Sequence, residues 1–252
     1  MSDKYEKLIQ QAVQLQTSGQ LDSATQIYNS ILSEHPDHHD ALHLLGAVAL
    51  ERGDGATAVP LIQRSLTGIR PTLSASARKK RLGDVYSNLS VAYLQLGQLE
   101  DALNAINLAL SNNPDIPDLL NNRGGINKLL GRYEAAESDF RRALQLAPNN
   151  AKALSHLASL MFLTEQLEQA EQYIDRALLI ESNSDYSHSM KAALCAARND
   201  ITAALHHFDE AIRIKPVNTY ARHDKAMLQL KNGQLKDAWN GLYFYPPAPP
   251  ND

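Results

Sequence analysis

An alanine that recurs at a fixed interval limits the folds open to this chain of 252 residues. Most steps between the copies are 34 residues long, and the step from Ala58 to Ala102 is 44 residues. The column consists of Ala24, Ala58, Ala102, Ala136, Ala170, Ala204 and Ala238. An alanine present in every copy indicates that two helix backbones cross there, too closely for a larger side chain.

A second column of small residues accompanies the alanines. It consists of Ala12, Gly46, Ser90, Gly124, Ala158, Ala192 and Ala226. Turn glycines recur as well, at Gly19, Gly53, Gly97, Gly131 and Gly233, with Glu165 and Asn199 at the same place in two copies. Terminating prolines recur at Pro36, Pro114, Pro148 and Pro216, with Pro71 one place late. The whole chain is therefore built from copies of one unit.

Residues 83–116 show this unit most clearly. Each half carries an apolar stripe at helical spacing, with Gly97 between the halves and Pro114 at the end. The stripes consist of Tyr86, Leu89, Ser90 and Tyr93, and of Leu99, Ala102, Ile106 and Ala109. Two short helices joined by a tight turn cannot bury both stripes alone, so we expect each hairpin to stack on its neighbours.

The period and the helix-turn-helix pattern resemble the tetratricopeptide repeat (TPR) family. The resemblance implies an all-α fold, a right-handed superhelical solenoid of stacked antiparallel helix pairs with about seven repeats. We place this solenoid at 1–245, followed by a proline-rich tail at 246–252. The expected repeats are 5–38, 39–72, 83–116, 117–150, 151–184, 185–218 and 219–245. Residues 73–82 contain no helix breaker, so we read them as a forward extension of the helix that holds Tyr86.

Composition excludes several function classes. The formal net charge of -4 gives no general electrostatic reason to bind nucleic acid or an anionic membrane. A single cysteine, Cys195, rules out an internal disulfide framework, and its place on an inner stripe indicates a buried structural thiol. No apolar run approaches the length of a membrane span, and the first residues do not form a signal peptide. We expect a soluble, cytoplasmic protein.

In TPR proteins the first helix of each pair lines a concave groove, and the resemblance implies which residues face it here. Polar side chains at regular spacing along such a groove suit an extended peptide, whose amides and carbonyls need partners. The expected groove residues are Asp84, Ser87, Asn88, Asn121, Asn122, Lys128, Lys152, Ser155, His156, Tyr186, Tyr220 and His223. The resemblance implies a protein or peptide partner and no cofactor.

Two clusters of charged or ligating side chains allow a second interpretation. Residues 78–81 form a basic run that is typical either of an anion-binding or import patch or of a solvated helix end, and we favour the helix end. His35, His38, His39 and His43 contain good metal ligands, but they span an expected turn between repeats and no cysteine joins them. We therefore predict no metal site.

Catalytic motifs are absent from the sequence: it has no phosphate-binding glycine loop, nucleophile elbow or metalloprotease helix. We interpret neighbouring acids, such as Glu137 and Asp139, as solvent-facing helix residues. The leading hypothesis is a non-catalytic scaffold that binds an extended partner segment in its groove.

Two alternatives stay open. The chain resembles the substrate-recruiting repeat arrays of bacterial glycosyltransferases similar to O-GlcNAc transferase, and residues 233–243 are similar to the segment that closes such arrays, without its Glu-Arg pair. The third hypothesis is self-assembly through the ends of the solenoid. The aromatic residues near the end of the sequence have two readings of their own: they cap the last repeat, or they lie on a surface that another domain covers. These residues are Trp239, Tyr243, Phe244 and Tyr245.

Overall fold

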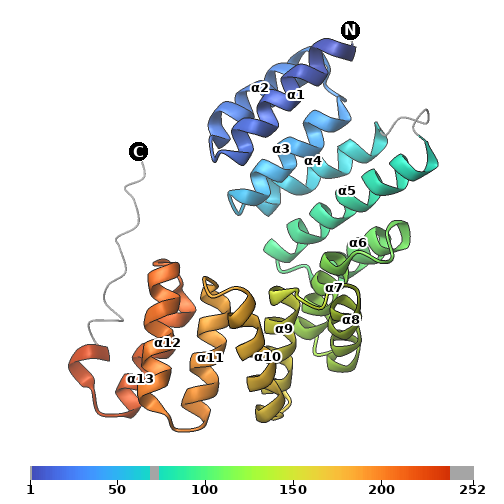
Figure 1. Cartoon of the computed structure of the whole chain (residues 1–252). Coiled ribbons are helices and arrows are strands. Elements are labelled where there is room, and N and C mark those ends of the chain that lie inside the picture. The colour runs from blue at the N-terminus through green and yellow to red at the C-terminus, as the bar shows by residue number, and fades with distance from the viewer. Residues whose placement is uncertain (1, 69–73, 239–252) are drawn as a thin grey trace. The chain divides into compact units, whose positions relative to one another are not determined.

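A computed structural model describes residues 2–68 and 74–238, and within these ranges the chain forms helices and no strand (Figure 1). The helices are α1 (Ser2–Thr17), α2 (Leu21–Glu34), α3 (His39–Glu51), α4 (Gly55–Thr67), α5 (Ala75–Gln95), α6 (Leu99–Asn112), α7 (Pro117–Leu129), α8 (Tyr133–Leu146), α9 (Ala151–Leu163), α10 (Leu167–Ile180), α11 (Asp185–Ala197), α12 (Ile201–Ile214) and α13 (Thr219–Lys231). Residues 235–238 are helical as well. The aromatic residues from Trp239 onward, the tail 246–252, Pro71 and Leu73 lie outside the described residues.

The chain forms two compact units, Met1–Asp139 and Phe140–Asp252, and their border lies within α8. In each unit consecutive helices pack side by side, as Figure 1 shows for α1 to α6 and for α9 to α12. The first helices of neighbouring pairs also touch, α1 with α3, α3 with α5, and α9 with α11. Stacked helix pairs confirm the predicted all-α repeat fold, while the handedness of the superhelix stays a prediction.

Both columns of small residues lie where helices meet. All seven alanines of the first column are fully buried, and the members of the second column are buried as well. Gly46 shows how close the helices come, because a Cβ atom added there would lie 2.6 Å from Cγ1 of Ile62 on the paired helix. The interpretation of the alanine column as a close helix contact is confirmed.

Large side chains fill the space one turn beyond each alanine. The residue four positions after the alanine is buried in every described repeat: Tyr28, Ile62, Ile106, Phe140, Ile174 and Phe208. Each such side chain contributes about 1.5–3 kcal/mol relative to an exposed one. Burial also raises the pKa of Tyr28 to about 12, and its hydroxyl donates to Oε1 of Gln16 at 3.2 Å.

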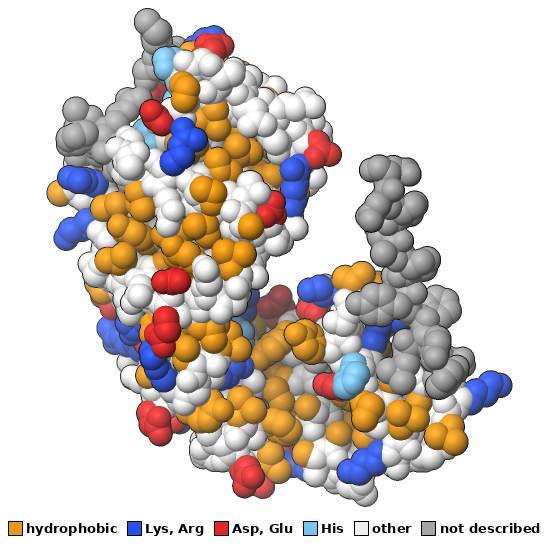
Figure 2. Space-filling view, turned by 180° about the vertical axis from the view of Figure 1, so that it is seen from behind, with side chains coloured by type: hydrophobic (Ala, Val, Ile, Leu, Met, Phe, Trp, Pro, Cys, Tyr) orange, Lys and Arg blue, Asp and Glu red, His pale blue; other side chains and the backbone are white. Residues whose placement is uncertain are grey.

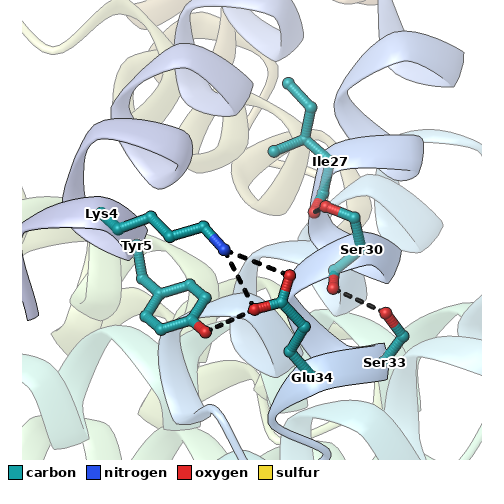
Figure 3. Close-up of polar contacts among 6 residues, drawn as sticks. All are labelled: Lys4, Tyr5, Ile27, Ser30, Ser33 and Glu34. Atoms are coloured by element: carbon teal, nitrogen blue, oxygen red, sulfur yellow. Dashed lines mark hydrogen bonds and ion pairs between the residues drawn. The ribbon is translucent and has the colours of Figure 1, made fainter. Parts of the chain in front are cut away.

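The first hairpin is joined at its open end by polar contacts that Figure 3 shows. Tyr5 and Lys4 on α1 both donate to the Glu34 carboxylate on α2, at 2.7 Å and 3.1 Å. The Tyr5 hydrogen bond, with help from Lys4, lowers the pKa of Glu34. Ser30 and Ser33 donate instead to backbone carbonyls of their own helix, to those of Ile27 and Ser30. Because the contact with Glu34 is exposed, hairpin stability depends mainly on the apolar stripes beneath it.

The turns inside the hairpins share one backbone conformation. The five turn glycines have φ between 70° and 79°, in the left-handed region that favours glycine. Glu165 and Asn199, which replace glycine in two repeats, adopt the same conformation with φ of 61° and 62°. The turn geometry is therefore set by the hairpin, and Glu165 carries a steric strain that glycine avoids.

The inserted residues lengthen α5, which begins at Ala75 behind the capping residue Ser74 and runs for 21 residues. Arg78, Lys79 and Lys80 are exposed, as a solvated helix end predicts. Arg81 is different: it lies half-buried, donates to Nε2 of His39 and pairs with Asp40 at 2.6 Å. The interpretation as a solvated end is wrong for this fourth residue, because α3 lies alongside it.

Asp139 corrects a second interpretation. Its carboxylate is buried and accepts from Arg123 Nη2 at 2.6 Å, Arg123 Nε at 2.9 Å and Asn127 Nδ2 at 3.2 Å. The Asp139 bond in turn raises the pKa of Arg123. Asp139 therefore joins α8 to α7, and the interpretation of this residue as solvent-facing is wrong.

We predict that Ala204→Leu lowers the free energy of unfolding by about 1–3 kcal/mol, because Ala204 is fully buried against Ala192 and Phe208. Thr202→Leu adds the same side chain at an exposed place on the same helix and serves as the control. Urea denaturation of both variants measures the difference. Equal stability of Ala204→Leu and wild type would mean that the crossing tolerates a branched side chain.

Glu165→Gly is expected to stabilise the protein by about 1 kcal/mol, because glycine removes the strain of the left-handed conformation. Gly131→Ala is the reciprocal variant and is expected to destabilise by a similar amount. An added Cβ atom at Gly131 meets nothing within 4 Å, so its effect reports the backbone alone. Thermal denaturation checks both signs, and a melting temperature that falls in Glu165→Gly contradicts the argument.

Stability is expected to fall as the pH drops from about 7 to about 5, partly through His43. Burial lowers the pKa of His43, against a smaller opposing effect of Asp84 and Asp40. The unfolded chain therefore binds a proton near pH 6.5 that the folded chain takes up only at lower pH, so acid favours unfolding. His43→Gln, which keeps a hydrogen-bond acceptor, should show a smaller loss over this range. An identical pH profile in thermal melts would exclude His43 as a contributor.

Candidate functional site

The first unit contains an open hollow of about 780 Å³ between the N-terminal half of α5, the end of α6 and the start of α7. Its lining residues are Ala75, Ser76, Lys79, Lys80, Asp84, Ser87, Asn88, Asn112, Asn113, Ile116, Asp118 and Leu119. Ile116 and Leu119 supply apolar surface, and most of the others are polar or charged. The forward extension of α5 forms part of the wall, so the insertion contributes to the hollow.

Three asparagines of the hollow are held by their amide nitrogens. Asn88 Nδ2 lies 3.0 Å from His43 Nε2 on α3, which must accept because an amide nitrogen can only donate. Asn112 Nδ2 donates to the Leu108 carbonyl at 2.8 Å, and Asn113 Nδ2 donates to the Lys80 carbonyl at 3.5 Å. Each side chain thus keeps its carbonyl oxygen as an acceptor for a ligand.

Charges of both signs line the hollow. The exposed ammonium groups of Lys79 and Lys80 come from the extension of α5, and the exposed carboxylate of Asp84 follows on the same helix. Asp118 adds a second carboxylate from the first turn of α7. Such a surface offers donors and acceptors within one concave area. It has the chemistry to bind a polypeptide backbone and has no nucleophile activated by a neighbouring base.

The expected groove residues fall into different environments. Asp84, Ser87 and Asn88 lie together in the hollow. Asn122 and Lys128 are half-buried on α7. In the second unit Lys152 is exposed, and His156 makes an edge-to-face contact with Tyr186 at 5.3 Å between ring centroids. Tyr220 and His223 are well exposed on α13.

Asn121 and Ser155 are buried, so a partner cannot reach their side chains. Ser155 Oγ lies 2.7 Å from Ser187 Oγ on α11 and donates to the Ala151 carbonyl at 2.9 Å. The groove pattern of the family assigned both residues to the surface. The error has a physical cause, since short polar side chains can turn inward where neighbouring first helices pack closely.

Sequence reasoning missed much of the hollow. The basic run predicts a solvated helix end for Lys79 and Lys80. Asn112, Asn113 and Ile116 belong to the second helix and turn of a repeat, outside the groove pattern. The available signal was the insertion, because ten extra residues in front of one repeat must lie over a neighbouring surface.

A second, more apolar hollow of about 580 Å³ lies in the second unit between α11, α12 and α13. Its lining residues are Ala193, Ala196, Phe208, Asp224, Met227, Leu228, Leu230 and Lys231. It contains few polar groups that could orient a ligand.

The N-terminal histidines have structural contacts. His38 caps α3 by accepting from the Ala41 amide at 3.3 Å, and His35 packs edge-to-face on Tyr5. His39 and His43 receive hydrogen bonds from Arg81 and Asn88. Across the described part of the chain, no three His, Cys, Asp or Glu residues lie close enough to hold a metal ion.

Cys195 lies half-buried against the α12 cluster of Ala204 and Phe208. Burial raises the pKa of its thiol, which therefore stays protonated at neutral pH. Of the helices that are described, none is both long enough and apolar enough to cross a bilayer.

On the face that Figure 2 shows, charged side chains of both signs are dispersed among hydrophobic and uncharged ones.

Solved structures similar to this chain share its fold. A tetratricopeptide repeat protein from Parabacteroides merdae is 20% identical, with a TM-score of 0.73 over 95% of this chain and 91% of that one. The Pseudomonas aeruginosa protein pilF is 18% identical, with a TM-score of 0.68 over 90% of this chain and 98% of that one. The APC/C structure of Cut9-Hcn1 is 16% identical, with a TM-score of 0.72, and the match covers 88% of this chain but 42% of that one. At such identities the likeness concerns the fold alone.

No curated protein matches the sequence. Family models do match: one described as tetratricopeptide repeat covers residues 9–73 and 88–151, and a second one of the same description covers residues 129–194. The first of these spans more than half of the chain, in agreement with the 34-residue period and the stacked hairpins. The chain therefore belongs to the tetratricopeptide repeat family.

Proposed function

We propose that this protein is a non-catalytic interaction module and that the hollow of its first unit binds an extended segment of a partner protein. The observation that carries the proposal is the set of side-chain groups that face the hollow and are left for a ligand. They are the carbonyl oxygens of Asn88, Asn112 and Asn113, the hydroxyl of Ser87 and the ammonium groups of Lys79 and Lys80.

An extended segment is the ligand that needs such groups. In a helix the backbone amides and carbonyls bond to one another, whereas an extended strand presents them along its whole length. The asparagine oxygens accept from backbone amides, and the lysines donate to backbone carbonyls. Ile116 and Leu119 add apolar surface for one side chain of the segment.

The framework around the hollow supports a pre-formed site. Asn88 is held by His43 of the neighbouring first helix, and Arg81 fixes the extension to Asp40. A surface whose side chains are already positioned loses less conformational entropy on binding. Proteins of this fold also occur in assemblies, since Cut9-Hcn1 is described as a hetero-tetramer.

Ser87→Tyr is expected to weaken binding at least about tenfold, because the larger side chain fills part of the hollow. The probe is an array of immobilised peptides of varied sequence, incubated with fluorescent wild-type protein. The strongest binders are then titrated in solution by calorimetry. Ser111→Tyr is the matched control, because Ser111 is exposed on α6 and lies outside the hollow.

Wild-type affinity in Ser111→Tyr together with a loss in Ser87→Tyr supports the hollow as the site. Equal affinity of Ser87→Tyr and wild type would assign binding to another surface. An array without any binder would overturn the proposal for linear segments. Circular dichroism melts of both variants separate a binding defect from a folding defect.

A further inference from the structure

We propose that the segment bound in this hollow is acidic, and that the inserted extension of α5 is the element that selects it. The inference rests on the proposed function and adds a class of partner: protein segments in which aspartate or glutamate side chains lie within an extended stretch. The extension supplies a specificity determinant that the repeats themselves lack.

The first observation is a set of adjacent cations without partners. In the described ranges of the chain, no carboxylate pairs with Arg78, Lys79 or Lys80, and all three are exposed. Some other arginines pair with an acid of the neighbouring hairpin, as Arg52 does with Asp22 and Arg132 with Glu100. This run therefore keeps its charge available, in a chain with a net charge of -4.

The second observation is that these cations are held beside the hollow. Arg81 binds Asp40 and His39 on α3, which fixes the rotation of the extension. Asn113 from the end of α6 donates to the Lys80 carbonyl on the other side. Lys79 and Lys80 consequently line the hollow, and Arg78 lies one residue before them on the same exposed turn.

The helix itself adds to the positive field. Residues 78–80 directly follow the first turn of α5, which contains no acidic residue, and the aligned peptide dipoles give this helix end a partial positive charge. Cations there repel the helix end and one another. A carboxylate bound between Lys79 and Lys80 relieves both repulsions and forms charge-assisted hydrogen bonds.

Asp84 and Asp118 explain why a polypeptide suits the site better than a nucleic acid or an anionic membrane. Both carboxylates line the same hollow, and they would repel a continuous row of phosphates. A peptide instead brings amide donors for Asp84, Asp118 and the asparagine oxygens together with its acidic side chains. An acidic peptide complements the lysines through its carboxylates and the aspartates through its backbone amides.

The test uses the full chain and the peptides selected on the array. In each bound peptide, acidic residues are exchanged for the corresponding amides, Asp for Asn and Glu for Gln, and affinities are measured by fluorescence anisotropy. We expect the exchange to weaken binding to wild type by about ten- to a hundredfold, as for the loss of hydrogen bonds between charged groups. Higher salt should reduce the affinity of the acidic peptides most.

Charge reversal of the extension supplies the matched comparison. Lys79→Glu with Lys80→Glu is expected to lose the preference for acidic peptides, so that acid and amide forms bind alike or the acid form binds less well. Lys215→Glu with Lys236→Glu changes the net charge by the same amount at exposed sites of the second unit and should retain the preference. Thermal melts establish that both double variants are folded.

Outcomes that contradict the inference differ from those that contradict peptide binding itself. If the acid and amide forms of a peptide bind in the hollow with equal affinity, the acidic preference is wrong, whereas the proposed interaction module is unaffected. An array without binders would remove both. Single-stranded oligothymidine or phosphatidylserine vesicles serve as further probes. The inference is wrong if one of these two probes binds as tightly as the acidic peptides and loses its binding in the Lys79→Glu, Lys80→Glu variant. Such a result would mean that the lysines bind phosphate groups.

Discussion

The close approach of two helices at the columns of small residues is the constraint on which the rest of this structure depends. Alanine at Ala58 and glycine at Gly46 allow the backbones of α3 and α4 to come so near that one added carbon atom at Gly46 would collide with Ile62. Large side chains such as Ile62 and Phe208 then pack one turn further on. Because packing energy falls steeply with small gaps, this spacing brings each hairpin to the density of a protein interior.

In a stack of hairpins each repeat is stabilised by contacts with the repeats next to it. Changes of sequence or length at the surface therefore leave the stack intact. The insertion before the third repeat lengthens α5, and Arg81 holds the added turns against α3. The same tolerance explains the turns, where Glu165 accepts the backbone conformation that glycine adopts elsewhere because the hairpin on either side requires it. Local strain is tolerated where packing on both sides determines the geometry.

Polar side chains in this fold include buried ones that join neighbouring helices and accessible ones that line the hollow. Asp139 with Arg123, and Ser155 with Ser187, are paired inside the protein and join neighbouring helices. The hollow beside α5 has the opposite character, because its asparagines use their amide nitrogens in hydrogen bonds within the protein and keep their side-chain oxygens as acceptors. A surface with positioned but incompletely used hydrogen-bonding groups is the part of such a scaffold that suits a partner.

Periodicity alone determined the helices, their pairing, the buried alanines and the tight turns, because each depends on contacts within a hairpin or with the next one. The expectation that Asp84, Ser87 and Asn88 face one groove came from the family resemblance and not from periodicity. Tertiary structure decided which polar residues turn inward, as Asn121, Ser155 and Asp139 do, and which distant segments meet. Arg81 pairs with Asp40, and Asn113 donates to the Lys80 carbonyl, although these residues lie far apart in the sequence and no local pattern predicts the contacts. The physical reason is that the burial of a polar side chain depends on partners supplied by another helix, as Asp139 on α8 depends on Arg123 on α7, whereas an apolar stripe is defined by its own helix.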